Sequence, residues 1–138
     1  MGRGSVNHIG IATDSLDNAA KVWEALGFAQ GDDEVVEDQG VKIRYMRGDG
    51  ETNIELLEPL SDDSPVGKFL SARGPGVQQI AVNVPDIVSK ISQLKGMGIR
   101  MINDDPILGS NGHKIAFIHP SSSGGVLIEL VEYGQSEL

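Results

Sequence analysis

Alternating hydrophobic and polar residues recur in two segments of this 138-residue chain. The first segment, over residues 6–12, reads VNHIGIA, and the second, over 77–84, reads VQQIAVNV. An alternation of period two is typical of a β-strand with one buried face, so Ile9 and Ile11 are expected on one face and His8 on the other. A stretch with apolar residues at helical spacing comes after each segment, which predicts a strand and then a helix in each half of the chain.

The two halves also match beyond these segments. The same interval separates His8 from Gln79 and Gly27 from Gly98, and the two glycines come directly after the two predicted helices. An internal repeat of this kind indicates one structural unit used twice. The predicted elements are a strand, a helix and three strands at about 6–12, 16–26, 33–37, 41–46 and 53–58, and again at about 77–84, 86–97, 99–103, 114–118 and 126–132.

We interpret residues 1–138 as a single domain with a pseudo-twofold axis between its halves. The first βαβββ module is expected to cover about residues 5–60 and the second about 76–133. A short connecting helix is expected at about 65–72, and no linker between these parts is long or low in complexity.

The balance of charges limits the classes of function. With 20 acidic and 11 basic residues the net charge is −9, so the surface would repel a phosphate backbone and a nucleic-acid partner is not expected. An anionic ligand would need a local group of cations, which Lys42, Arg44 and Arg47, with Lys68 and Arg73 beyond them, could supply. The sequence has no cysteine and no apolar run of the roughly 20 residues that span a bilayer, so we expect a cytoplasmic protein with no membrane partner.

Four polar residues stand at matching positions of the predicted strands, each on the face opposite the aliphatic side chains. His8 and Gln79 are counterparts in the first strand of each half, and Glu55 and Glu129 are counterparts in the last. One such residue alone would be interpreted as a surface or hydrogen-bonded polar residue, but two pairs related by a twofold axis are expected to converge. Two carboxylates held close together repel each other unless a cation lies between them. The set therefore predicts a site for one divalent metal ion, which could be cobalt, manganese, nickel, magnesium or zinc.

Several strings in the chain resemble those of one enzyme family. They are His8-Ile-Gly-Ile-Ala12, Gln39-Gly-Val-Lys-Ile43, Ile54-Glu-Leu-Leu-Glu-Pro-Leu60, Phe117-Ile-His-Pro120 and Gly124-Gly-Val-Leu-Ile-Glu-Leu130. From about residue 7 to residue 131 the chain is similar to the methylmalonyl-CoA epimerases of the vicinal oxygen chelate superfamily, which includes glyoxalase I. The resemblance implies an α+β fold in which two tandem βαβββ modules form a cupped mixed β-sheet, with helices outside, around one divalent metal ion. It also implies a homodimer and an acyl-CoA substrate.

The family reaction interconverts the (R) and (S) epimers of methylmalonyl-CoA. A proton leaves C2 and another returns on the opposite face, so the reaction needs an electrophile for the enolate and two acid/base groups. By resemblance, Glu129 is a metal-site carboxylate and one acid/base group. Asp38, immediately before the Gln-Gly-Val string, corresponds to the other.

Two positions depart from the family pattern. The second half of the family begins with a His-His-Ile-Ala string whose second His binds the metal, whereas this chain has Gln79 there. A Gln carbonyl oxygen is a weaker ligand than an imidazole, so we expect a lower metal affinity. Asp38 stands where the family has Glu, and its side chain reaches less far. A glyoxalase-like lyase or isomerase and a non-catalytic ligand-binding member of the superfamily are the alternatives.

Overall fold

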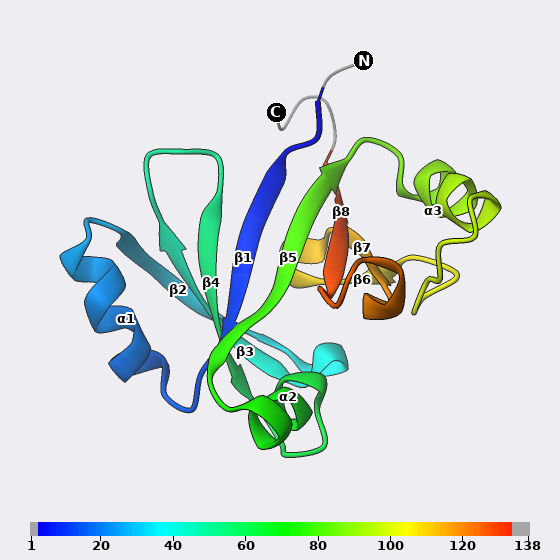
Figure 1. The fold of residues 1–138 in the computed structure, drawn as a ribbon. Coiled ribbons are helices and arrows are strands. Elements are labelled where there is room, and N and C mark those ends of the chain that lie inside the picture. The colour runs from blue at the N-terminus through cyan, green and yellow to red at the C-terminus, as the bar shows by residue number, and fades with distance from the viewer. Residues whose placement is uncertain (1–2, 134–138) are drawn as a thin grey trace. The chain divides into compact units, whose positions relative to one another are not determined.

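The computed structural model describes residues 3–133, which divide into two compact units. We call His8–Gln78 the N-terminal unit, and the residues from Gln79 onward together with those before His8 the C-terminal unit. Each half of the chain contributes a strand, a helix and three further strands (Figure 1). The α+β class and the two βαβββ modules of the vicinal oxygen chelate fold are therefore confirmed.

The N-terminal half of the chain forms a four-stranded mixed sheet in the order β2-β3-β4-β1. Strand β1 runs parallel to β4, and the other neighbours are antiparallel. Helix α1 lies along one side of this sheet, and α2 lies near the end of β4 (Figure 1). Its elements are β1 (Val6–Ala12), α1 (Leu16–Ala25), β2 (Ala29–Val36), the 3₁₀ helix η1 (Glu37–Gln39), β3 (Val41–Arg47), β4 (Asn53–Pro59) and α2 (Pro65–Arg73).

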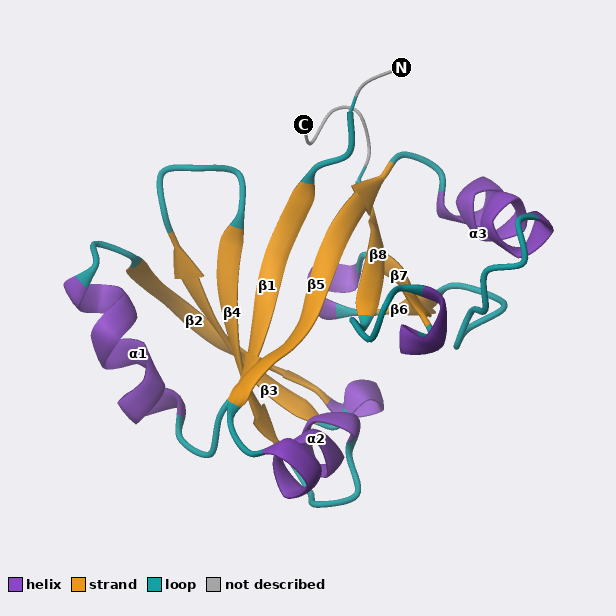
Figure 2. Cartoon of the chain, viewed as in Figure 1, coloured by secondary structure: helices purple, strands orange, loops and turns teal. Residues whose placement is uncertain are grey.

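The C-terminal half repeats this topology with the strand order β5-β8-β7-β6. Strand β5 is parallel to β8, and the other pairs are antiparallel. Helix α3 packs on β7 and β8. The elements, which Figure 2 distinguishes by type, are β5 (Gly76–Val84), α3 (Ile87–Gly96), β6 (Ile107–Leu108), η2 (Ser110–Gly112), β7 (Lys114–Ile118), η3 (Pro120–Ser122) and β8 (Ile128–Glu132).

The two long helices begin in the same way. The N-cap of α1 is Ser15, and its Oγ accepts the N–H of Asn18. The N-cap of α3 is Asp86, which accepts the N–H of Ser89. A glutamate from the last strand of each module also accepts the first helical N–H, since Glu58 accepts from Leu16 and Glu132 from Ile87, each at 3.0 Å. The repeat therefore places a carboxylate at the positive end of each helix dipole.

Two predicted strands differ from the structure. The strand expected at 33–37 runs from Ala29 to Val36, and the chain then turns into η1. The strand expected at 99–103 is wrong, because Met101 forms only an isolated bridge and the edge strand is β6. The side chain of Asn103 accepts the N–H of Phe117, which a backbone carbonyl of a neighbouring strand would otherwise accept. Two aspartates and a proline come next in the chain, and these residues are unfavourable in a strand.

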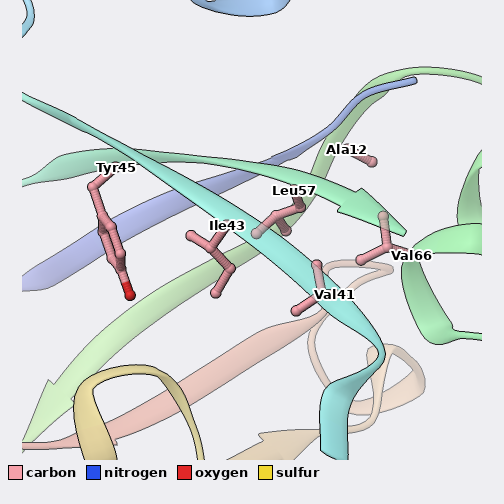
Figure 3. Packing of buried hydrophobic residues seen from close by; sticks show 6 residues of the cluster. All are labelled: Ala12, Val41, Ile43, Tyr45, Leu57 and Val66. Carbon is pink, nitrogen blue, oxygen red and sulfur yellow. The ribbon is translucent and has the colours of Figure 1, made fainter. Parts of the chain in front are cut away.

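Each sheet has one face packed on its helix and a second face with a different core. In the N-terminal unit the helix face contains Leu16, Ala20, Met46, Ile54 and Leu56. The opposite face, which we call the inner face, carries a second cluster formed by Ala12, Val41, Ile43, Tyr45 and Leu57, with Val66 from α2 packed against it (Figure 3). In the C-terminal unit the inner face, opposite α3, carries Ala81, Ile115 and Val131. Polar side chains on these inner faces are thus held against apolar neighbours.

Candidate active site

His8 and Glu55 form a buried pair on the inner face of the N-terminal unit. The distance from His8 Nδ1 to Glu55 Oε2 is 3.0 Å, and the side chains are only 3% and 7% exposed. Strands β1 and β4 are parallel neighbours in which Glu55 pairs with Gly10, two residues after His8. Residues two apart on a strand share a face, so the register itself brings the imidazole and the carboxylate together.

Gln79 and Glu129 form the corresponding pair in the C-terminal unit. Gln79 Nε2 donates to Glu129 Oε1 at 2.5 Å, and both residues are buried. Glu129 pairs with Ala81, which lies two residues after Gln79. This register repeats that of His8, Gly10 and Glu55. Each module therefore carries one pair of side chains with possible metal-ligand atoms, which we call its donor pair, at an equivalent position.

The four side chains are chemically suited to bind a divalent cation. They offer an imidazole, two carboxylates and an amide, all buried, and a buried carboxylate is costly without a positive or hydrogen-bonding partner. Within residues 3–133, no group of three or more His, Cys, Asp or Glu side chains is assembled as a metal cluster. The binding of a metal by His8, Glu55, Gln79 and Glu129 stays a prediction.

Asp38 occupies a different kind of position. It lies in η1, at the end of β2, and is exposed to solvent. The segment is fixed by Gly40, which adopts a left-handed conformation at φ 64° and whose carbonyl accepts the N–H of Leu60. A Cβ at Gly40 would also lie 2.7 Å from Ser64 Cβ, so glycine is required there for two reasons. The role of Asp38 as an acid/base group is likewise a prediction.

Sequence reasoning missed a second polar pair on the inner face of the N-terminal unit. Tyr45 pairs with Glu55 across β3 and β4, and its hydroxyl donates to Glu34 Oε1 at 2.5 Å. Tyr45 is 7% exposed, and Figure 3 shows it on the same side of β3 as Val41 and Ile43. The period-two pattern of residues 41–47 was the signal that could have placed this tyrosine beside the site.

The basic residues of β3 are divided between its two faces. Arg44 binds both carboxylate oxygens of Asp33 at 2.7 and 2.9 Å and also contacts Asp17 of α1 at 2.8 Å. The hydrogen bonds from Arg44 lower the pKa of Asp33 against the opposing effect of burial, and those from Asp33 and Asp17 raise the pKa of Arg44. Lys42 lies 3.8 Å from the same aspartate. Lys42 and Arg44 therefore lie on the face opposite the inner face, where their ion pairs with Asp33 stabilise the fold.

Two further histidines have structural partners. His119 is the N-cap of η3, and its Nδ1 accepts the N–H of Ser121 at 3.0 Å. His113 stacks on Tyr133 with ring centroids 4.9 Å apart. Neither residue is needed for the donor set of the two modules.

Comparisons with known proteins show which proteins this chain is similar to. Residues 7–117 match the model of the Glyoxalase/Bleomycin resistance protein/Dioxygenase superfamily. The mitochondrial methylmalonyl-CoA epimerase of Homo sapiens is 34% identical over 92% of this chain and 73% of its own length. The uncharacterized protein YqjC of Bacillus subtilis is 39% identical over 92% of this chain and 91% of its own.

The solved structures show the same likeness. A methylmalonyl-CoA epimerase in complex with methylmalonyl-CoA and NH4+ superposes with a TM-score of 0.90 at 36% identity, over 99% of each chain. The chain therefore belongs to the Glyoxalase/Bleomycin resistance protein/Dioxygenase superfamily. Within it, the chain belongs to the methylmalonyl-CoA epimerase family, whose members are isomerases. No helix within the described residues is long and apolar enough to cross a membrane.

Proposed function

We propose that this protein interconverts (R)- and (S)-methylmalonyl-CoA by removing and returning the proton at C2. The observation that carries the proposal is the donor pair of each module, His8 with Glu55 and Gln79 with Glu129, at equivalent registers in a chain of the epimerase family. Similarity to an epimerase that was solved with methylmalonyl-CoA supports an acyl-CoA substrate.

The same four residues are the proposed ligands of one divalent ion. When bound, such an ion supplies Lewis-acid stabilisation for the thioester oxygen as charge develops on it. His8 and the two glutamates provide ligand atoms directly. Gln79 directs its NH2 group at Glu129, so a 180° rotation of the amide would be needed to present its oxygen instead. We therefore expect Gln79 to be the weakest of the four ligands.

Two carboxylates are the proposed acid/base groups. Glu129 is buried, and its hydrogen bond from Gln79 fixes the orientation of the carboxylate that takes the C2 proton. Asp38 is exposed on η1, where it can exchange its proton with solvent, and it is proposed to return a proton on the other face of C2. Each such group typically contributes about 10²–10⁴-fold to the rate.

The proposal is tested by starting from one pure epimer of methylmalonyl-CoA. Protein freed of metal by a chelator would be supplied separately with cobalt, manganese, nickel, zinc, magnesium or ammonium ions, and the epimer ratio followed with time. We expect conversion to a mixture of epimers with at least one divalent ion and little conversion without. A protein that leaves the epimer unchanged with every ion would contradict the proposal.

The alternatives give different results in matched assays. Turnover of the glutathione hemithioacetal of methylglyoxal, without epimerisation, would indicate a glyoxalase-like enzyme. Tight binding of an acyl-CoA without conversion would indicate a ligand-binding member of the superfamily. The homodimer implied by the family is checked by the mass of the protein in solution, measured by light scattering.

A further inference from the structure

Strand β3 carries one cation on the inner face of the N-terminal unit. Residues of β3 alternate between the faces, so Lys42 and Arg44 lie on the α1 side and Arg47 lies on the side of Tyr45. The first two are engaged by Asp33. No ion pair joins Arg47 to a carboxylate among residues 3–133. Of the three basic residues of β3, Arg47 is therefore the one on the inner face.

The guanidinium of Arg47 is supported by its neighbours. Its Cζ lies 5.1 Å from the centroid of the Tyr45 ring, within the range of a cation–π contact. Gly31 on β2 leaves the space for this arrangement, because a Cβ there would lie 3.3 Å from Tyr45 Cβ and 3.5 Å from Arg47 Nε. A planar cation stacked in this way keeps its N–H groups available at the edge of the ring.

Tyr45 is in turn fixed in place. It is buried, and the bond from its hydroxyl to Glu34 sets the position of the ring on which Arg47 rests. Two carboxylates of this face have partners other than Arg47: Glu34 accepts the tyrosine hydroxyl, and Glu55 lies 3.0 Å from His8. Neither carboxylate forms an ion pair with Arg47, whose guanidinium charge is therefore left for a bound anion.

The strand ladders place Arg47 level with His8. Met46 pairs with Ile54, so the next residue, Arg47, lies opposite Asn53 at the end of the β3–β4 ladder. Asn53 in turn pairs with His8. Arg47 and His8 are therefore two strands apart in one row, a backbone separation of about 10 Å. An acyl group bound at His8 and Glu55 would lie within the span between these residues.

We propose that Arg47 binds the free carboxylate of the acyl group, and that it selects 2-substituted malonyl thioesters over simple acyl thioesters. This inference rests on the proposed function and adds to it a residue that recognises the substrate. A guanidinium pairs with a carboxylate through two parallel hydrogen bonds, which gives both affinity and orientation. Fixing the carboxylate would also hold the neighbouring C2–H bond in a defined direction.

The test compares two ligands that differ in this carboxylate. Binding of methylmalonyl-CoA and of propionyl-CoA, which lacks the carboxylate, would be measured by calorimetry for the wild-type protein and for Arg47→Met. We expect the variant to lose on the order of 10-fold or more in affinity for methylmalonyl-CoA and to bind propionyl-CoA unchanged. Arg73→Met is the matched control, because Arg73 also lies over a ring, that of Phe69 in α2.

Three outcomes would overturn the inference. An equal loss for both ligands would place Arg47 at the phosphates of CoA, and no loss for either would remove it from the site. A loss of the same size in Arg73→Met would indicate a general effect of charge. If Arg47→Met does not fold, Arg47→Lys replaces it, and there we expect a smaller loss that is again confined to methylmalonyl-CoA. A wild-type protein that neither binds methylmalonyl-CoA nor converts its epimers would instead contradict the proposed function.

Discussion

Gln79 donates a hydrogen bond from Nε2 to Oε1 of Glu129, and this amide stands where the repeat partner, His8, has an imidazole. Gln79 is the proposed metal ligand that departs from the family pattern, and Glu129 is the proposed acid/base carboxylate, so this bond links the two roles. A change at residue 79 should therefore affect both metal binding and the position of Glu129.

Replacing Gln79 with His tests its role as a ligand. Imidazole binds cobalt, nickel and zinc more strongly than an amide oxygen does, so Gln79→His should raise the affinity of the protein for these ions. The measurement is calorimetric titration of chelator-treated protein with each metal. Gln78→His, one residue earlier on the strand and so directed to the other face, is the control. An affinity unchanged by Gln79→His would remove residue 79 from the metal site.

Glu129→Gln tests the proposed base. The amide keeps the size of the side chain but cannot accept a proton, so the epimerisation rate should fall by about 10²–10⁴-fold. Glu132→Gln is a suitable control on the same strand, because Glu132 accepts the N–H of Ile87 at the start of α3. That control should lower thermal stability and leave the rate per folded molecule close to wild type. A Glu129→Gln protein with full activity would exclude Glu129 as the base.

Asp38 is tested by lengthening and by neutralising its side chain. If its short reach limits proton transfer, Asp38→Glu should raise kcat, whereas Asp38→Asn should lower it by about 10²-fold or more. Because Asp38 is exposed, neither variant should change the free energy of unfolding by more than about 0.5 kcal/mol. Equal rates for all three proteins would show that another group returns the proton.

The ion cluster of Arg44 predicts a dependence of stability on pH. Its hydrogen bonds lower the pKa of Asp33 below the ordinary value of 3.8, so the folded state binds a proton at this carboxyl less readily than the unfolded state does. This contribution to stability is complete above the unfolded pKa and is lost as the pH falls through the lowered folded value. Asp33→Asn should therefore destabilise the protein by about 1 kcal/mol at neutral pH and by less in strong acid.

The measurement is denaturant unfolding of Asp33→Asn and wild type at several pH values. Asp32→Asn, which changes an adjacent exposed acid, is the control. A difference between Asp33→Asn and wild type that stays constant down to strong acid would contradict the role assigned to the ion pair.

Periodicity in the sequence predicted most of the strands and the matching positions of the polar residues in the two halves. Strand alternation and the repeat were enough to put His8, Glu55, Gln79 and Glu129 at corresponding points of two modules, because a parallel ladder has a fixed period of two. The alternation pattern did not predict hydrogen bonds between a side chain and the backbone. The side chain of Asn103 replaces a strand carbonyl, and the expected strand at 99–103 does not form. The other difference lies at the end of β2, where the chain leaves the sheet at Val36 and turns into η1.

The tyrosine of the inner face was missed for a different reason. A lone tyrosine on a strand carries no motif, so the importance of Tyr45 depends on which residues lie opposite it. Only the pairing of Tyr45 with Glu55 and its bond to Glu34 reveal a polar row across the sheet. The alternation of residues 41–47 gives the face on which Tyr45 lies, but the residue opposite it depends on the turn between β3 and β4.

The central claim is proton exchange at C2 of methylmalonyl-CoA, and exchange with deuterated water measures it most directly. The loss of the C2 proton signal would be monitored by NMR with metal-loaded wild-type protein and with Glu129→Gln. We expect deuterium to enter C2 in the presence of wild-type protein far faster than in buffer, with the rate greatly reduced in the variant. A wild-type protein that binds methylmalonyl-CoA and leaves the C2 proton in place would contradict the account.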